Sequence, residues 1–214
     1  MSFLQVAPEL LGLDALDYYL KDDWEDNSLV DRSATESGLY GTPRTNEAGD
    51  ILIGRDRPEW RIRSGSPTVD SGRLAYSSGS TPWISTISNI GYGSWSYDYE
   101  ETSIGGQNSY FDFISTQTAS FRSECYEHIL DLGSNQSVLV LRSGGNTNQL
   151  INAGATNNSR YKITRDAYGN FEMLDDASAL GTATDTTIST SMSMRFGSGS
   201  VSGTDFKIDN LVVK

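Results

Sequence analysis

The stretch Trp95-Ser96-Tyr97-Asp98-Tyr99-Glu100 carries the alternation of aromatic and polar residues on which the fold prediction depends. Successive side chains of a β-strand point to opposite faces, so Trp95, Tyr97 and Tyr99 fall on one face. A strand with one apolar and one polar face is typical of an antiparallel sheet that packs a core on one side only. We therefore expect these three rings to lie in the core.

The same period of two recurs on both sides of this stretch. Apolar and polar residues alternate in 60–63, 161–164, 188–196 and 206–209. In the third of these segments one apolar face is predicted to contain Ile188, Met192, Met194 and Phe196. Two runs, 129–132 and 138–141, are more continuously apolar and are typical of central strands. Turn residues separate the runs and almost no helical pattern is present, which predicts an all-β antiparallel sandwich or jelly roll.

The length of the chain, 214 residues, suits one large β domain with a short extension. We expect an N-terminal segment at 1–21 and a sandwich at 22–214. The sandwich is predicted to include a long loop at about 33–57, with a short strand at 51–53. The single cysteine, Cys125, cannot form a disulfide within the chain, so stability has to come from packing.

The N-terminal segment is more apolar than the loop-rich sequence after it. Leu13, Leu16 and Leu20 are spaced as on one face of a helix, although Gly12 weakens a helix. The segment either covers an edge of the sandwich or docks on a partner chain, and we slightly favour docking.

The chain is acidic, with 28 Asp and Glu against 16 Lys and Arg and a net charge of −12. This balance argues against non-specific binding of nucleic acid, which needs basic patches. Asp exceeds Glu and Arg exceeds Lys. Such a surface resembles proteins from high-salt organisms, where dense salt screens like charges, but an ordinary acidic protein could share it.

Neither a membrane span nor an export signal is predicted from the sequence. Apolar runs stay well short of the roughly 20 residues that a spanning helix needs. The opening Met1-Ser2-Phe3-Leu4-Gln5 lacks the basic start of a secretory signal. We expect a protein made without signal-directed export, or carried out of the cell in a particle, although a chain that had lost its signal would look the same.

Four segments in order resemble the laminin-G-like, concanavalin-A-like jelly-roll superfamily. They are DDWEDNSL at 22–29, WRIRSGSPTVDSGRL at 60–74, the hairpin at 161–171 that contains YKITRD, and FKIDNLVV at 206–213. The resemblance spans roughly 22–213 and implies a jelly-roll sandwich. It does not fix function, because one fold hosts many activities.

This resemblance also implies a structural calcium ion. Related jelly rolls bind one through acids of the opening strand and an Asp of the closing strand, which lie side by side. Asp22, Asp23, Glu25 and Asp209 match those positions. Backbone carbonyls would have to complete the shell, because calcium takes six to eight oxygens. The alternative is a solvated acidic cluster.

The sequence does not predict a catalytic residue. Laminarinase-type glycoside hydrolases of this fold use an E-x-D-x-(x)-E strand, but Ser96 stands in place of the first Glu. Asp98 and Glu100 are therefore more simply a solvated polar face. His128 is the one histidine, and no G-x-S-x-G motif accompanies it, so we expect it to be a sheet residue. Cys125 is expected to be buried or half-buried.

Aromatic residues at turns are the candidates for sugar contact. Trp83 and Tyr92 lie near predicted turns, and flat rings with polar neighbours suit stacking on a pyranose. We predict these two as exposed ligand-binding residues.

The sequence leaves three functions open. We favour a non-enzymatic virion protein, such as a tail, fibre, spike or turret component of a virus of a halophilic host. It would be a homo-oligomer that contacts other virion proteins through the N-terminal segment, and it could bind a host surface glycan. The alternative is a carbohydrate-binding module of an extracellular protein. A divergent glycoside hydrolase ranks last.

Overall fold

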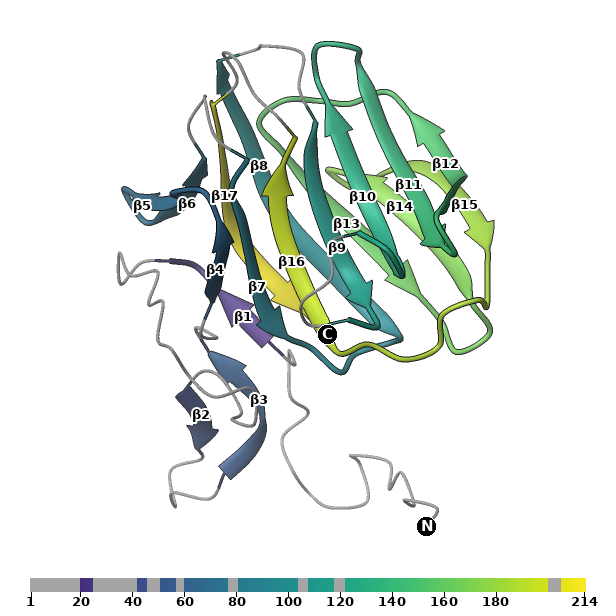
Figure 1. Ribbon diagram of the computed structural model, residues 1–214, viewed down its shortest axis with the longest axis horizontal. Helices are drawn as coiled ribbons and strands as arrows, with labels where there is room; N and C mark the ends of the chain where they lie inside the picture. Colours follow the sequence, from purple (N-terminus) through teal and green to yellow (C-terminus); the bar gives the residue numbers. More distant parts are fainter. Residues whose placement is uncertain are drawn as a thin grey trace.

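The computed structural model describes residues 20–24, 42–45, 51–56, 60–76, 81–103, 108–117, 122–199 and 205–214 (Figure 1). In these residues all regular structure is β-strand, and the strands form two sheets packed face to face. The predicted all-β sandwich is confirmed. The described residues contain no helix that could cross a membrane.

In the described part of the chain, the larger layer, sheet A, contains ten strands. Its main path runs through β15 (Ser178–Thr184), β14 (Asn170–Asp175), β13 (Ser159–Arg165), β8 (Gly93–Ser103), β17 (Asp205–Val213), β1 (Leu20–Asp22), β3 (Ile51–Asp56) and β2 (Thr42–Thr45). The short strands β6 (Arg73–Tyr76) and β5 (Thr68–Asp70) extend it beside β17. Among the described residues of this sheet, the pair β1 and β3 is parallel and the other pairings are antiparallel.

The smaller layer, sheet B, contains seven strands formed by the described residues. In order they are β12 (Asn146–Ala153), β11 (Gln136–Ser143), β10 (Cys125–Asp131), β9 (Ser109–Ser115), β16 (Ser193–Ser198), β7 (Trp83–Ile87) and β4 (Arg61–Ser64). The two apolar runs predicted as central strands form parts of β10 and β11, which lie next to each other.

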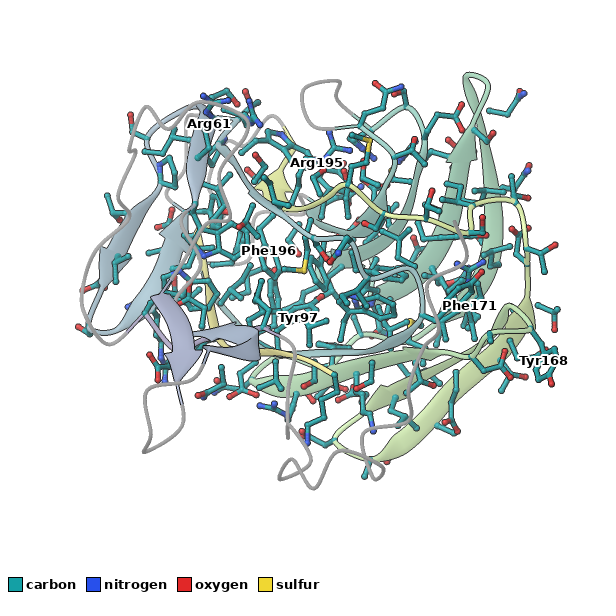
Figure 2. All side chains as sticks on the ribbon, turned by 90° about the horizontal axis from the view of Figure 1, so that it is seen from below. Arg61, Tyr97, Tyr168, Phe171, Arg195 and Phe196 are labelled. Atoms are coloured by element: carbon teal, nitrogen blue, oxygen red, sulfur yellow. The ribbon has the colours of Figure 1, made fainter. Side chains whose placement is uncertain are left out.

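Aromatic rings fill the space between the sheets. Trp95, Tyr97 and Tyr99 of β8 are at most 2% exposed, as their alternation predicts. Tyr97 meets Phe111 of β9 edge-on with 5.1 Å between ring centroids, and Phe111 stacks on Phe196 of β16 at 4.2 Å. Figure 2 shows Tyr97 and Phe196 in the middle of the molecule. Aromatic pairs at these distances contribute about 0.5–1.5 kcal/mol beyond the burial of their area.

His128 is a polar residue inside this core. Its Nδ1 lies 2.8 Å from the Tyr97 hydroxyl and its Nε2 lies 2.8 Å from Ser137 Oγ. Burial lowers the pKa of His128 to about 3, so the ring is neutral at ordinary pH. Both ring nitrogens have partners, which fits the predicted role as a sheet residue.

Three predicted details differ in the structure. Leu20 belongs to β1 and is 1% exposed, so the sandwich already includes Leu20 and Lys21; residues 1–19 lie outside the described part. The predicted loop at 33–57 contains two strands, β2 and β3, and β3 is longer than the strand predicted at 51–53. Met192 precedes β16 and is 52% exposed, whereas Ile188, Met194 and Phe196 are buried as predicted.

Candidate functional site

Polar side chains of four neighbouring strands meet on the outer face of sheet A. In β8 the three buried rings point inward, so Asp98 and Glu100 point outward. The same alternation sends Arg160 of β13 and Asp209 of β17 outward, and both pair with Asp98 in the register. Arg73 enters from β6, beside β17. The register therefore gathers residues that are far apart in the sequence.

These residues line an open pocket of about 270 Å³. Arg160 Nη1 lies 2.7 Å from Asp98 Oδ1, and Arg160 Nη2 donates a hydrogen bond to Ser96 Oγ at 3.0 Å. Arg73 pairs with Glu100, and its Nε lies 3.5 Å from Asp209 Oδ2. We call this group, with Lys207 and Asn210, the outer-face pocket.

A bulge in β17 shapes the pocket. The register of β17 against β8 shifts between Asp209 and Val212, and Asn210 has a φ of 48°. Asn tolerates this left-handed conformation better than other residues with a side chain. The bulge aims Asn210 at β8, where its Nδ2 donates to Asp98 Oδ2 at 2.7 Å. Bulges often redirect a side chain next to a functional site.

The pocket offers hydrogen-bond donors and acceptors side by side. The Arg160 and Arg73 side chains are 42% and 41% exposed, and those of Asp98 and Glu100 are 38% and 32% exposed. The charged groups hold each other in fixed positions while parts of each face solvent. Such an arrangement can bind a ligand that is rich in hydroxyl groups. Asp98 and Glu100 lie on the polar face that the sequence predicted for them.

The two predicted sugar-contact residues have different surroundings. Tyr92 is 41% exposed, and the guanidinium of Arg165 lies 5.0 Å from its ring centroid. Trp83 is 1% exposed, so its predicted exposure is wrong. Its ring stacks on Tyr110 at 5.7 Å and covers Gly197, where an added Cβ would overlap it. Trp83 is the first residue of strand β7.

Two of the four predicted calcium residues, Asp22 and Asp209, do not lie together. The opening and closing strands do lie side by side, as β1 and β17. However, Asp22 pairs with Leu211, a core residue, whereas Asp209 pairs with the outward-pointing Asp98, so the two carboxylates lie on opposite faces of sheet A.

The surroundings of Asp22 also differ from a metal site. Its carboxylate accepts hydrogen bonds from Trp60 Nε1 at 2.6 Å and from the backbone N–H of Trp24 at 3.0 Å. Asp23 is half-buried, and Glu25 lies outside the described residues. In the described part of the chain no three acidic, His or Cys side chains gather as a metal site. Calcium binding stays a prediction.

A second charged group, which the sequence did not reveal, lies on the outer face of sheet B. Asp112 and Glu127 face each other from β9 and β10, and both are 0% exposed. Arg195 lies 2.8 Å from Asp112, while Arg122 and Arg142 each lie 2.6 Å from Glu127. Burial and the neighbouring Glu127 raise the pKa of Asp112 to about 7. We call this group the buried acid pair.

Neither charged group could be found from the sequence alone. Alternation places Asp112 between Phe111 and Phe113, and Glu127 between Tyr126 and His128, so both acids point away from the core. Their pairing needs the register of β9 against β10, which alternation does not supply. The outer-face pocket also depends on strand register, so the sequence did not identify its residues Arg73, Arg160, Lys207 and Asn210. Cys125, predicted as buried or half-buried, is 0% exposed in β10.

No protein-family model and no curated protein sequence matches the chain. Solved structures with a similar fold were found. The carbohydrate-binding module CBM66 from Bacillus subtilis has a TM-score of 0.59 at 14% identity, over 72% of this chain and 94% of that chain. The apo Crh5 transglycosylase has a TM-score of 0.59 at 13% identity, over 90% of both chains. The Bacillus licheniformis beta-glucanase has a TM-score of 0.56 at 12% identity, over 72% and 91%. At these identities the likeness shows the fold alone, which is the concanavalin-A-like jelly roll.

Proposed function

We propose that this chain is a non-catalytic carbohydrate-binding domain and that the outer-face pocket is its sugar site. The observation that carries the proposal is the set of paired charges in that pocket. Asp98, Glu100 and Asp209 offer acceptors, and Arg73 and Arg160 offer donors, within a few ångströms of one another. A sugar hydroxyl both donates and accepts a hydrogen bond, so it can bridge such pairs.

The size of the pocket supports a small ligand portion. A volume of about 270 Å³ lies just below the roughly 300–1,000 Å³ of pockets for drug-sized ligands, so one ring or chain end fits better than several. The fold likeness to a carbohydrate-binding module supports the same class of ligand.

The positions of the acids support binding over catalysis. Asp98 and Glu100 each lie in an ion pair with an arginine. Asp112 and Glu127 face each other in sheet B, but their complete burial leaves a substrate no path to them. A glycosidase needs two carboxyl groups that flank a bound glycosidic bond.

Isothermal titration against a panel of glycans, selected first on a glycan array, tests the proposal. Arg160→Met removes the guanidinium that contacts Asp98 and Ser96, and we expect at least about a tenfold loss of affinity, which is about 1.4 kcal/mol. Lys162→Met is the matched control, because Lys162 lies two residues away on the same face and does not line the pocket. It should bind as the wild type does.

Other outcomes would overturn parts of the proposal. If Tyr92→Ala abolishes binding and Arg160→Met does not change it, the sugar site lies at Tyr92 and not in the outer-face pocket. Hydrolysis of a bound glycan would refute the non-catalytic role, and absence of binding across the panel would refute the function itself.

A glycan-binding module can also serve in a virus particle, where it would attach to a host. As a second and more specific proposal, the chain is a virion protein of a virus that infects a halophilic host. The alternative is a module of an extracellular protein. The acidic composition with few lysines supports the virion proposal. Portal, capsid or tail genes beside the gene for this chain would support the virion, and glycan-degrading enzymes in their place would contradict it.

A further inference from the structure

The free edge of sheet B is formed by β12. This strand pairs with β11 on one side, and on its other side the described residues provide no strand. An edge strand presents unpaired backbone N–H and C=O groups along its free side, which makes it a template for another strand. Asn146, Thr147, Asn148 and Gln149 of β12 are all exposed. Figure 1 shows β12 at the margin of the molecule, next to β15.

This edge lacks the charges and the proline that protect most edge strands, and its irregularity is a bulge at Leu150, between Gln149 and Ile151. The regular stretch that a partner strand can pair with is therefore 146–149. Natural edge strands carry lysine, other charges or proline that discourage a partner. The segment 143–159, which contains β12 and its flanking turns, has no charged residue and no proline, in a chain with 44 charged side chains. By contrast, β4 at the other end of sheet B contains Arg61 and Arg63. The strand β15 is flanked by Asp176 and Asp185.

The side chains of β12 suit pairing with a copy of the same strand. In a two-fold interface, residues near the axis face their own copies, so a charged residue would meet a like charge. An amide group can donate to and accept from an identical amide. Four of the eight residues of β12 have amide side chains: Asn146, Asn148, Gln149 and Asn152.

The edge strand β12 is also held in place by β15 of the facing sheet A. Ile151 of β12 is 5% exposed and packs on Gly181 of β15, where an added Cβ would lie 2.8 Å from the Ile151 side chain. The two sheets thus close against each other at this margin, and β12 packs on β15. A rigid edge loses little conformational entropy when a partner strand pairs with it.

We propose that two copies of this chain associate through β12, edge to edge and antiparallel, so that sheet B continues from one copy into the other. Each copy has a net charge of −12, and two such molecules repel wherever charged surfaces meet. The uncharged segment 143–159 is where this repulsion is lowest, which favours a second copy as the occupant. This inference does not depend on the glycan proposal.

Sedimentation equilibrium of the full chain over a range of concentrations and salt tests the proposal. We expect a dimer whose dissociation constant falls as added salt screens the repulsion. Asn148→Lys places two like charges in the paired strands and should weaken the dimer at least about tenfold. Thr190→Lys, at an exposed loop residue, makes the same charge change and should leave the dimer unaltered.

Hydrogen exchange provides a readout that needs no variant. Amides of 146–153 should become more protected as the concentration rises, whereas those of β4 should not change. A wild type that stays monomeric at the highest concentration would overturn the proposal. So would a dimer that Asn148→Lys does not weaken, since its contact would then lie elsewhere, for example in the N-terminal segment.

Discussion

Single residues decide how closely neighbouring strands of sheet B can pack. Gly197 lies under the ring of Trp83, and any Cβ there would overlap the ring. We predict that Gly197→Ala lowers the free energy of unfolding by about 1–3 kcal/mol, the usual cost of overpacking. Urea denaturation measures this. Gly154→Ala is the control, because its added Cβ would meet Asn135 at an ordinary 3.6 Å, and it should change stability by less than about 0.5 kcal/mol.

The buried acid pair makes stability depend on pH. Asp112 keeps its proton in the folded state up to a pKa of about 7, whereas its usual value is 3.8. Between these two pKa values the folded chain binds more protons than the unfolded chain. The contribution of Asp112 to the free energy of unfolding therefore falls as pH rises, by up to about 1.4 kcal/mol per pH unit. Asp112→Asn removes this contribution.

Urea denaturation of both proteins at several pH values from about 4 to 7 checks this prediction. The difference in stability between wild type and Asp112→Asn should change steadily across this range. A constant difference would show that Asp112 is ionised throughout, with Arg195 and Arg122 outweighing its burial.

At the scale of one element, the bulge in β17 joins stability to binding. Asn210 supplies both a left-handed backbone and an amide that contacts Asp98. Asn210→Gly keeps the backbone conformation and loses the amide, so we expect near wild-type stability with weaker glycan binding. Asn210→Ala should be less stable than Asn210→Gly by about 1 kcal/mol, because alanine is strained at this φ. Thermal unfolding and titration calorimetry separate the two effects, and equal stabilities would contradict the role of the backbone.

Elements were more predictable from the sequence than the contacts between them. Alternation identified the buried residues of β8, β13 and β17, because burial on one face follows directly from the period of two. It failed at Met192, which lies just before its strand begins. The separate prediction from turn proximity failed at Trp83, whose burial depends on Gly197 of another strand. The outer-face pocket could not be predicted because it joins β6, β8, β13 and β17 through their register. Three residues of that pocket were considered from the sequence, but not as sugar ligands. Asp98 and Glu100 were predicted as a solvated polar face, and Asp209 as a calcium ligand.

At the scale of the whole molecule, the two proposals reinforce each other. A dimer joined through β12 would carry two outer-face pockets on one rigid body. Two linked sites gain avidity for a surface that displays many copies of a glycan, provided that both can engage at once. A monovalent soluble sugar would not reveal this gain, so immobilised and soluble forms of the ligand should be compared.

The most direct test of the outer-face pocket as a sugar site follows backbone amide signals by NMR while a glycan found on the array is titrated into the labelled chain. We predict that the largest shifts fall on residues around Asp98, Arg160 and Asn210, with sheet B unaffected. Shifts confined to the loop around Tyr92, or to the strands that hold Asp112 and Glu127, would contradict this assignment.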